Sequence, residues 1–111
     1  MKKNEMSEKD ENKIEISDQL YSDTMKELCK IFTQEDEGLV ADFIDCLFTP
    51  AERRDIVKRW LLVKEIDKGT TQRDIAKKFS MSLCRITRGS KELHKKDSAF
   101  RKVLDIVKKN N

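Results

Sequence analysis

Proline occurs once and glycine three times in the 111 residues of this sequence, and aromatic residues make up only 6% of it. No segment alternates apolar and polar residues for long enough to form a strand, whereas apolar residues recur at the spacing of helices. No apolar run approaches the roughly 20 residues that a membrane-spanning helix needs. These absences predict an all-α protein without a membrane partner.

The cysteines do not form a recognisable ligand set. Cys29, Cys46 and Cys84 are an odd number without C-x-x-C spacing, and His94 is the sole histidine. Such a set supports neither a disulfide framework nor a structural zinc site. Three thiols behind an N-terminal stretch without the apolar core of a signal peptide predict a reducing, cytoplasmic location. The sequence indicates no metal and no bound cofactor.

The apolar content is low for a chain of this length. Apolar residues make up 37% of the sequence and charged residues 41%. A chain of this size is long enough for one domain but buries only about two-thirds of its unfolded surface. Because so few apolar residues would give a lone chain a thin core, the sequence predicts a dimer.

The net charge of +3 conceals two halves of opposite sign. Residues 1–48 hold 6 lysines and arginines against 13 aspartates and glutamates, whereas residues 49–111 hold 18 against 8. Solvated helix faces explain many charge runs, but a basic half joined to an acidic half is typical of nucleic-acid binders.

The chain divides into an arm and a folded region. Residues 1–17 are polar and strongly charged, which predicts a solvated arm, and residues 18–111 are expected to form one domain of six helices. Residues 33–36 resemble a capping box for the second helix. Thr49, followed by Pro50 and by Glu52 as its capping partner, marks the start of the third helix, and Gly69 marks its end.

Residues 71–94 have the pattern of a helix-turn-helix, with the turn at residues 80–82. Residues at the inward positions of the two helices and the turn are apolar or small: Ile75, Ala76, Phe79, Met81 and Ile86. The motif alone has many false positives among helix pairs, so its outward residues matter.

The outward positions of this helix pair carry groups that bind DNA. Arg73 and Arg85 can each make a bidentate contact with guanine, and a plain phosphate contact is the alternative for Arg85. Side chains suited to phosphate contacts are Gln72, Lys77, Thr87 and Lys91. Leu83 and Cys84, in the first turn of the second helix, complete the predicted DNA-facing set.

Two arginines and a glycine require a further explanation. Gly89 lies inside the second helix, although glycine destabilises a helix interior by up to about 1 kcal/mol relative to alanine. From the residues alone, Arg88 is interpreted as a phosphate contact, and Gly89 as a glycine that the helix tolerates without a functional role. Arg59 lies beside Trp60 in a stretch that is apolar all round, and a buried arginine requires an anion or several acceptors.

Three segments taken together resemble the tryptophan repressor family. They read TPAERRDIVKR, KGTTQRDIAKKF and ITRGSKEL, and they fall within residues 48–93. The resemblance implies an intertwined homodimer in which each recognition helix enters a major groove of a palindromic operator. It also implies that L-tryptophan is a corepressor, bound between the recognition helix and the core of the two subunits.

The resemblance also assigns the ligand site. Arg59 would pair with the ligand carboxylate and Arg88 would stack on its indole, while Gly89 would let the ligand approach the backbone. Backbone carbonyls just before Thr49, near Cys46 and Phe48 of the partner chain, would meet the ligand amino group, with Thr49 as a wall of the pocket.

Three features depart from the family pattern. Glu92 stands where some members carry a serine that helps to hold the ligand, and Arg85 stands where a smaller residue is common. The turn GTTQR before the first helix of the pair is one residue shorter than the usual form. These departures concern the ligand and the operator more than the fold.

Two other functions remain as alternatives. The first is a ligand-independent DNA-binding protein of the same fold, in which Arg59 and Arg88 are structural. The second, more remote, is a small helical dimeric enzyme of the chorismate-mutase type. The leading interpretation is a non-enzymatic repressor controlled by L-tryptophan.

Overall fold

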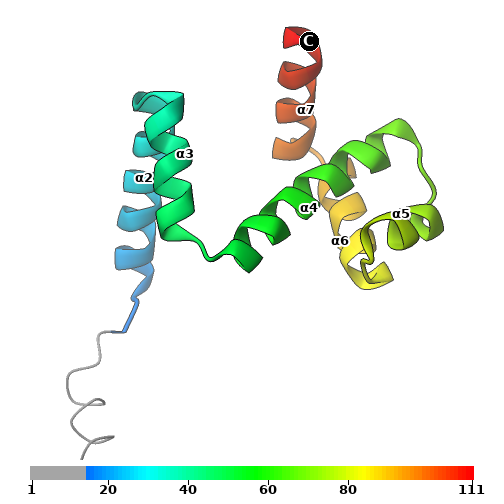
Figure 1. Ribbon diagram of the computed structural model, residues 1–111, viewed down its shortest axis with the longest axis horizontal. Coiled ribbons are helices and arrows are strands. Elements are labelled where there is room, and N and C mark those ends of the chain that lie inside the picture. The colour runs from blue at the N-terminus through cyan, green and yellow to red at the C-terminus, as the bar shows by residue number, and fades with distance from the viewer. Residues whose placement is uncertain (1–14) are drawn as a thin grey trace, which may run out of the picture. The chain divides into compact units, whose positions relative to one another are not determined.

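The computed structural model describes residues 15–111, so the predicted arm over residues 1–17 lies outside the described residues except for residues 15–17. The described part is all-helical and contains no strand, which confirms the predicted class. Its helices are α2 (Asp18–Gln34), α3 (Glu37–Leu47), α4 (Pro50–Lys68), α5 (Gln72–Phe79), α6 (Leu83–His94) and α7 (Ala99–Asn110) (Figure 1). None of these helices is long and apolar enough to span a bilayer.

Short polar side chains begin these helices by accepting the first free backbone N–H groups. The capping residues are Ser17 for α2, Asp36 for α3, Thr49 for α4, Thr71 for α5, Ser82 for α6 and Ser98 for α7. The cap of α4 is the reciprocal box predicted from the sequence, since Glu52 returns a hydrogen bond to the Thr49 N–H at 2.9 Å.

The capping box predicted over residues 33–36 was wrong. Thr33 lies inside α2, where its hydroxyl donates to the Cys29 carbonyl at 2.9 Å. The residue that caps α3 is instead Asp36, whose carboxylate accepts from the Leu39 N–H at 3.1 Å. An acidic cap also matches the positive end of the helix dipole. The helix boundary therefore moves by one turn relative to the prediction.

Two residues in the left-handed region end α4 and α5. Gly69, with φ of +91°, ends α4 at the predicted position, where its lack of a side chain makes this conformation free of strain. Ser80 ends α5 with φ of +50° and starts the three-residue turn to α6. The turn thus falls at residues 80–82, as predicted.

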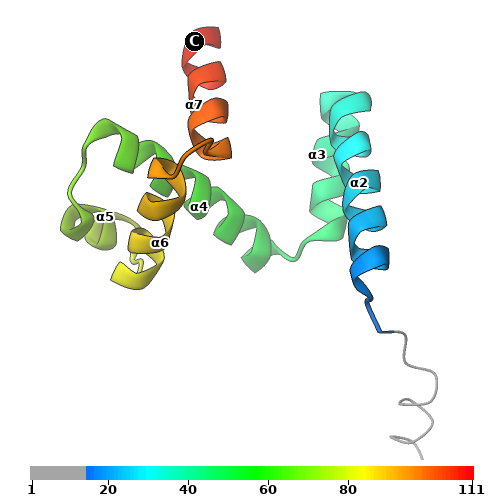
Figure 2. The same cartoon turned by 180° about the vertical axis from the view of Figure 1, so that it is seen from behind.

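The described residues up to Phe43 belong to one compact unit, and Ile44–Asn111 form a second. In the first unit, α2 lies beside α3 (Figures 1 and 2), and the rings of Phe32 and Phe43 meet with centroids 6.2 Å apart. Neither helix buries a single residue within this chain. Apolar residues of both helices, such as Leu20 and Leu39, are therefore left uncovered within this chain.

The second unit contains two small cores on either side of a helix crossing. Figures 1 and 2 show α6 crossing α4, with α5 on one side of the crossing and α7 on the other. The α5 side is filled by the buried residues Leu62, Ile75, Met81 and Ile86. The α7 side is filled by Val63, Leu93 and Leu104, with Trp60, Ile66 and Phe100 packed around them. Adjacent residues of α4, Leu62 and Val63, therefore belong to different cores.

An ion cluster holds α7 against α4. The carboxylate of Asp67, on α4, accepts from Arg101 at 2.9 Å and from Lys108, both on α7. Asp67 is only 10% exposed, and the hydrogen bonds from Lys108 and then Arg101 hold its pKa below the ordinary aspartate value. This cluster fixes the position of α7, which carries Phe100 to the edge of a cavity beside α4.

Candidate functional site

The helix pair α5–α6 packs as its sequence pattern predicted. Ile75 and Ile86 are fully buried and Met81 lies beneath the turn at 7% exposure. Ala76 and Phe79 pack against this cluster at partial burial. All five inward residues predicted from the sequence therefore contact the core that α5 and α6 share with α4.

A buried carboxylate attaches α5 to α4. Glu65 is 5% exposed, and its side chain accepts from Lys78 of α5 at 2.7 Å and from Lys68 at 3.1 Å. The hydrogen bond from Lys78, followed by that from Lys68, lowers the pKa of Glu65. Sequence reasoning missed this residue, because nothing in the local pattern distinguishes it from the exposed acids of α4.

Most of the predicted DNA-facing residues lie on the exposed surface of α5 and α6. The exposed members are Gln72, Arg73, Lys77, Leu83, Cys84, Thr87 and Lys91. Arg85 is the exception, since its guanidinium turns back to α4 and donates to Asp55 at 2.6 Å. Its side chain is 40% exposed. The sequence predicted that Arg85 points outward to DNA, whereas in the structure it contacts α4.

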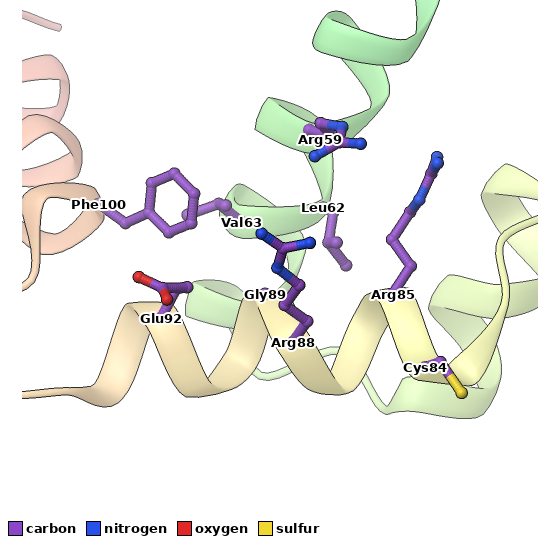
Figure 3. Close-up of a pocket in the computed structure, with 9 residues that line it drawn as sticks. All are labelled: Arg59, Leu62, Val63, Cys84, Arg85, Arg88, Gly89, Glu92 and Phe100. Atoms are coloured by element: carbon purple, nitrogen blue, oxygen red, sulfur yellow. The ribbon is translucent and has the colours of Figure 1, made fainter. Parts of the chain in front are cut away.

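A cavity of about 590 Å³ lies between α4 and α6, with one residue of α7 at its edge. Its lining combines three cations with apolar and acidic groups: Arg59, Leu62, Val63, Cys84, Arg85, Arg88, Gly89, Glu92 and Phe100. Figure 3 shows Arg85 and Arg88 rising from α6 towards α4, and Phe100 at the opposite end of the space from Arg85. The volume lies within the range of about 300–1,000 Å³ typical of small-molecule pockets.

The cavity brings together four of the residues that the resemblance assigned to the ligand, namely Arg59, Arg88, Gly89 and Glu92. It also contains Leu62, Val63 and Phe100, which sequence reasoning missed as pocket residues. Leu62 and Val63 belong to an apolar run that predicts core in general. Phe100 lies on a different helix, and only the packing of α7 brings it to the site.

The expectation of a buried Arg59 was wrong within this chain. Its side chain is 54% exposed, and its Nε donates to Asp55, one turn earlier on α4, at 2.8 Å. The apolar run beside it is buried on one side only, since Leu61 is 37% exposed while Leu62 is 2% exposed. The charge of Arg59 is therefore balanced by a local carboxylate rather than by burial beside an anion.

Gly89 lines the cavity, but the space it leaves is filled by the protein itself. A Cβ built on Gly89 would lie 3.0 Å from Cδ2 of Leu62 and 3.7 Å from Cδ1 of Ile66. Distances near 3.0 Å between such carbons lie inside normal van der Waals contact. The missing side chain thus permits the close crossing of α6 over α4. Because Gly89 also lines the cavity, the approach of a ligand to its backbone stays a prediction.

The remaining predicted ligand residues lie away from this cavity. Cys46 and Thr49 are exposed, and neither they nor Phe48 line the cavity. The Phe48 carbonyl accepts a hydrogen bond from Nη1 of Arg53 at 2.7 Å, and the Asp45 carbonyl accepts one at 2.8 Å. Arg53, which sequence reasoning missed, therefore satisfies two backbone carbonyls just before the start of α4.

Glu92 keeps its charge in the wall of the cavity. Its carboxylate pairs with Lys95 at 2.7 Å, and the hydrogen bond from Lys95 lowers the pKa of Glu92. Arg88 adds a weaker electrostatic contribution in the same direction. The cavity thus presents cations, one anion and an apolar floor, a combination that suits a zwitterion with an apolar side chain.

Comparisons of this sequence with a family model and with curated proteins all give Trp repressors. The family model described as Trp repressor protein matches residues 22–108. A Trp operon repressor homolog from Chlamydia caviae is 39% identical over 80 residues, which cover 70% of this chain and 76% of that relative. Homologs of the same name from Chlamydia trachomatis serovar L2 and Xylella fastidiosa (strain M23) are 33% identical over 69 residues and 30% identical over 77 residues. These alignments cover 61% and 68% of this chain, and 73% and 80% of the two relatives.

No solved structure matches the chain. The family match places the chain among transcriptional repressors, which are regulators and not enzymes, and so excludes the chorismate-mutase alternative. The chain belongs to the Trp repressor family.

Proposed function

We propose that the protein is a DNA-binding repressor that acts as a homodimer on a palindromic operator in the cytoplasm, with L-tryptophan as its corepressor. The observation that carries this proposal is the arginine-lined cavity directly beneath α6. A ligand seated there contacts both the core helix α4 and the helix expected to read DNA. Ligand binding and the position of α6 are then linked through shared side chains.

The lining of the cavity matches the chemistry of an aromatic amino acid. Arg88 provides a planar cation that can stack on an indole or pair with a carboxylate. Leu62, Val63 and Phe100 provide apolar contact for the ring, and Glu92 provides a partner for an ammonium group. A close indole amino acid offers the same groups to the cavity, and titration with both compounds compares them.

A homodimer accounts for the apolar surface that this chain leaves uncovered. Large exposed apolar residues occur on five of the described helices, among them Tyr21 at 60%, Leu39 at 51%, Val57 at 56% and Ile106 at 58% exposure. Apolar surface distributed in this way is typical of chains that bury it against a partner. A second copy would also bring Cys46, Phe48 and Thr49 to the ligand, as the family arrangement implies.

The surface of the helix pair supports the DNA-binding part of the proposal. Arg73, Lys77 and Lys91 are exposed on α5 and α6. A short helix pair with a basic outer face has the geometry in which the second helix enters a major groove. The charge of residues 49–111, which hold 18 lysines and arginines against 8 acids, favours the same partner.

Calorimetric titration with L-tryptophan, and separately with 5-methyltryptophan, tests the ligand. Wild-type protein is expected to bind, whereas Arg59→Gln and Arg88→Gln are expected to lose most of the affinity. Lys58→Gln is the matched control, because Lys58 is exposed on the same helix beside Arg59 and does not line the cavity. Equal loss in Lys58→Gln would mean that net charge, and not the cavity, determines binding.

Selection of duplexes from a random library, with and without L-tryptophan, tests the repressor function. The selected site is expected to be palindromic and to bind more tightly with the ligand, by about 5–150-fold. Reciprocity requires that the same duplex tighten L-tryptophan binding by the same factor. Equal DNA affinity with and without ligand would favour the ligand-independent DNA-binding protein instead.

A further inference from the structure

One carboxylate bridges two of the three arginines that line the cavity. Asp55 lies on α4, one turn before Arg59, and its Oδ2 accepts from Arg59 Nε at 2.8 Å. Its Oδ1 accepts from Nη1 of Arg85, on α6, at 2.6 Å. The two carboxylate oxygens are thus divided between the core helix and the helix that is expected to read DNA.

The bridge from Asp55 to Arg85 joins residues 30 positions apart and is the ion pair between α4 and α6 in the described part of the chain. The other contacts between these helices that surround the cavity are apolar, including the close approach of Gly89 to Leu62. A guanidinium can exchange one carboxylate partner for another, because both offer the same charged hydrogen bonds, whereas a packed apolar contact offers a charged ligand no such partner. The ion pair is therefore the part of this interface that a charged ligand can rearrange.

Asp55 is charged and partly shielded. Its side chain is 34% exposed, compared with 40% for Arg85 and 54% for Arg59. The hydrogen bond from Arg59, with a further one from Arg85, lowers the pKa of Asp55. At neutral pH Arg59 therefore already holds a carboxylate of the kind that an amino-acid ligand would bring to it.

We propose that Asp55 competes with the carboxylate of the ligand for Arg59, and that this competition sets how strongly the ligand is coupled to DNA binding through Arg85. With Asp55 as its partner, Arg85 is held on α4 and is withdrawn from the DNA-facing surface. When a ligand carboxylate takes over Arg59, it places a second negative charge beside Asp55, and the repulsion moves Asp55 away and releases Arg85 towards DNA. This inference rests on the proposed corepressor and names a residue that regulates its site.

The protein binds the ligand more weakly when Asp55 holds Arg85 than when Arg85 is released. This difference in ligand affinity between the two states is the condition for coupling. A ligand shifts an equilibrium only by its differential affinity for the two states. Removing the competing carboxylate should therefore tighten ligand binding and, at the same time, reduce the dependence of DNA binding on the ligand. A residue that merely orients Arg59 would have the opposite effect on ligand affinity.

The test compares Asp55→Asn with Asp105→Asn by calorimetry. Asp105 is an exposed carboxylate on α7, 3.6 Å from Arg101, so its substitution makes the same change of charge away from the cavity. Asp55→Asn is expected to bind L-tryptophan at least about five-fold more tightly than wild type. Tryptamine, which has the indole and the ammonium but no carboxylate, is expected to bind Asp55→Asn and wild type equally. Asp105→Asn should resemble wild type throughout.

Weaker or unchanged L-tryptophan binding in Asp55→Asn would overturn the proposal, and so would equal tightening of tryptamine. DNA binding gives a second readout on the selected duplex. Asp55→Asn should bind it more tightly than wild type without ligand, and the factor gained on adding L-tryptophan should fall.

Hydrogen exchange separates failure of this inference from failure of the corepressor. The amides in the first two turns of α6 should exchange faster in Asp55→Asn and in Arg85→Gln than in Asp105→Asn, because both variants remove the bridge. The double variant should add nothing further, since each single change already breaks the same pair. If wild-type protein takes up no L-tryptophan, the proposal of L-tryptophan as corepressor is wrong, and hydrogen exchange alone tests the bridge. Equal exchange rates in all variants would then overturn the role of the Asp55–Arg85 bridge.

Discussion

Gly89 on α6 and Leu62 on α4 approach so closely that a Cβ on Gly89 would lie 3.0 Å from Cδ2 of Leu62. Leu62 is 2% exposed and belongs to the core that supports α5, so it has little room to move away. The glycine therefore sets the distance between the helix that carries Arg59 and the helix that carries Arg85 and Arg88. The cavity between these arginines exists at its observed width because α6 can approach α4 at this one position.

Gly89→Ala is expected to lower the free energy of unfolding by about 1 kcal/mol. Alanine improves helix propensity by up to about 1 kcal/mol, but overpacking a rigid contact costs about 1–3 kcal/mol, so the second effect wins. Urea denaturation measures the difference. Thr87→Ala, at an exposed position of the same helix, is the control for propensity alone. In a Leu62→Val background, the loss caused by Gly89→Ala should shrink, and a stabilising Gly89→Ala would mean that Leu62 yields without strain.

Local signals in the sequence predicted helix boundaries well because caps depend on neighbouring residues. The Thr49 cap, the Gly69 end and the turn at residues 80–82 all follow from steric and hydrogen-bonding rules that act over four or five residues. The false capping box at Thr33 shows the limit of such rules. Asp36 competes for the same role three residues later, and the better acceptor begins the helix.

The charges of the site were less predictable because their partners are distant in sequence or arise from packing. The helical position of Arg85 predicted an outward side chain, but its guanidinium binds Asp55 on α4, 30 residues earlier in the sequence. Arg59 looked buried because Trp60 and Leu61 follow it, but one face of α4 is uncovered in this chain. No local pattern gives the crossing of two helices, and the crossing determines which side chains share a cavity.

The cluster of Asp67 with Arg101 and Lys108 predicts a loss of stability in acid. Because these cations lower the pKa of Asp67, its contribution is fully present above the ordinary aspartate pKa of about 3.9 and is lost as the pH falls through the lower value of the folded protein. Thermal melting at a series of pH values should therefore show a smaller acid-induced decrease in Asp67→Asn than in wild type. Asp105→Asn, whose carboxylate is 62% exposed, should retain most of the decrease. Identical curves for Asp67→Asn and wild type would show that the cluster does not contribute.

Arg73 and Lys77, both exposed on α5, are expected to affect DNA binding in different ways. If Arg73 reads a base, Arg73→Ala should cost about 1–3 kcal/mol on the selected operator and relax the preference at one base pair. Lys77→Ala should weaken all sequences alike and flatten the dependence of log K on log salt by about one unit. Binding titrations over operator variants at several salt concentrations distinguish the two. Uniform weakening by Arg73→Ala would make Arg73 a phosphate contact.

The exposed apolar residues of α4 predict that a charge placed there prevents assembly. Val57 is 56% exposed on α4, and Leu83 is 57% exposed on the helix that is expected to face DNA, so the two positions differ in location but not in exposure. Val57→Asp should yield a species near the chain mass of 13.0 kDa by light scattering, or an unfolded chain by circular dichroism, because an unpaired charge would be buried at the dimer interface. Leu83→Asp should keep the dimeric mass of wild type, together with a melting temperature that rises with protein concentration. A wild-type protein with the mass of one chain at micromolar concentration would contradict the dimer. Loss of the dimer in Leu83→Asp but not in Val57→Asp would mean that the chains associate through the opposite face.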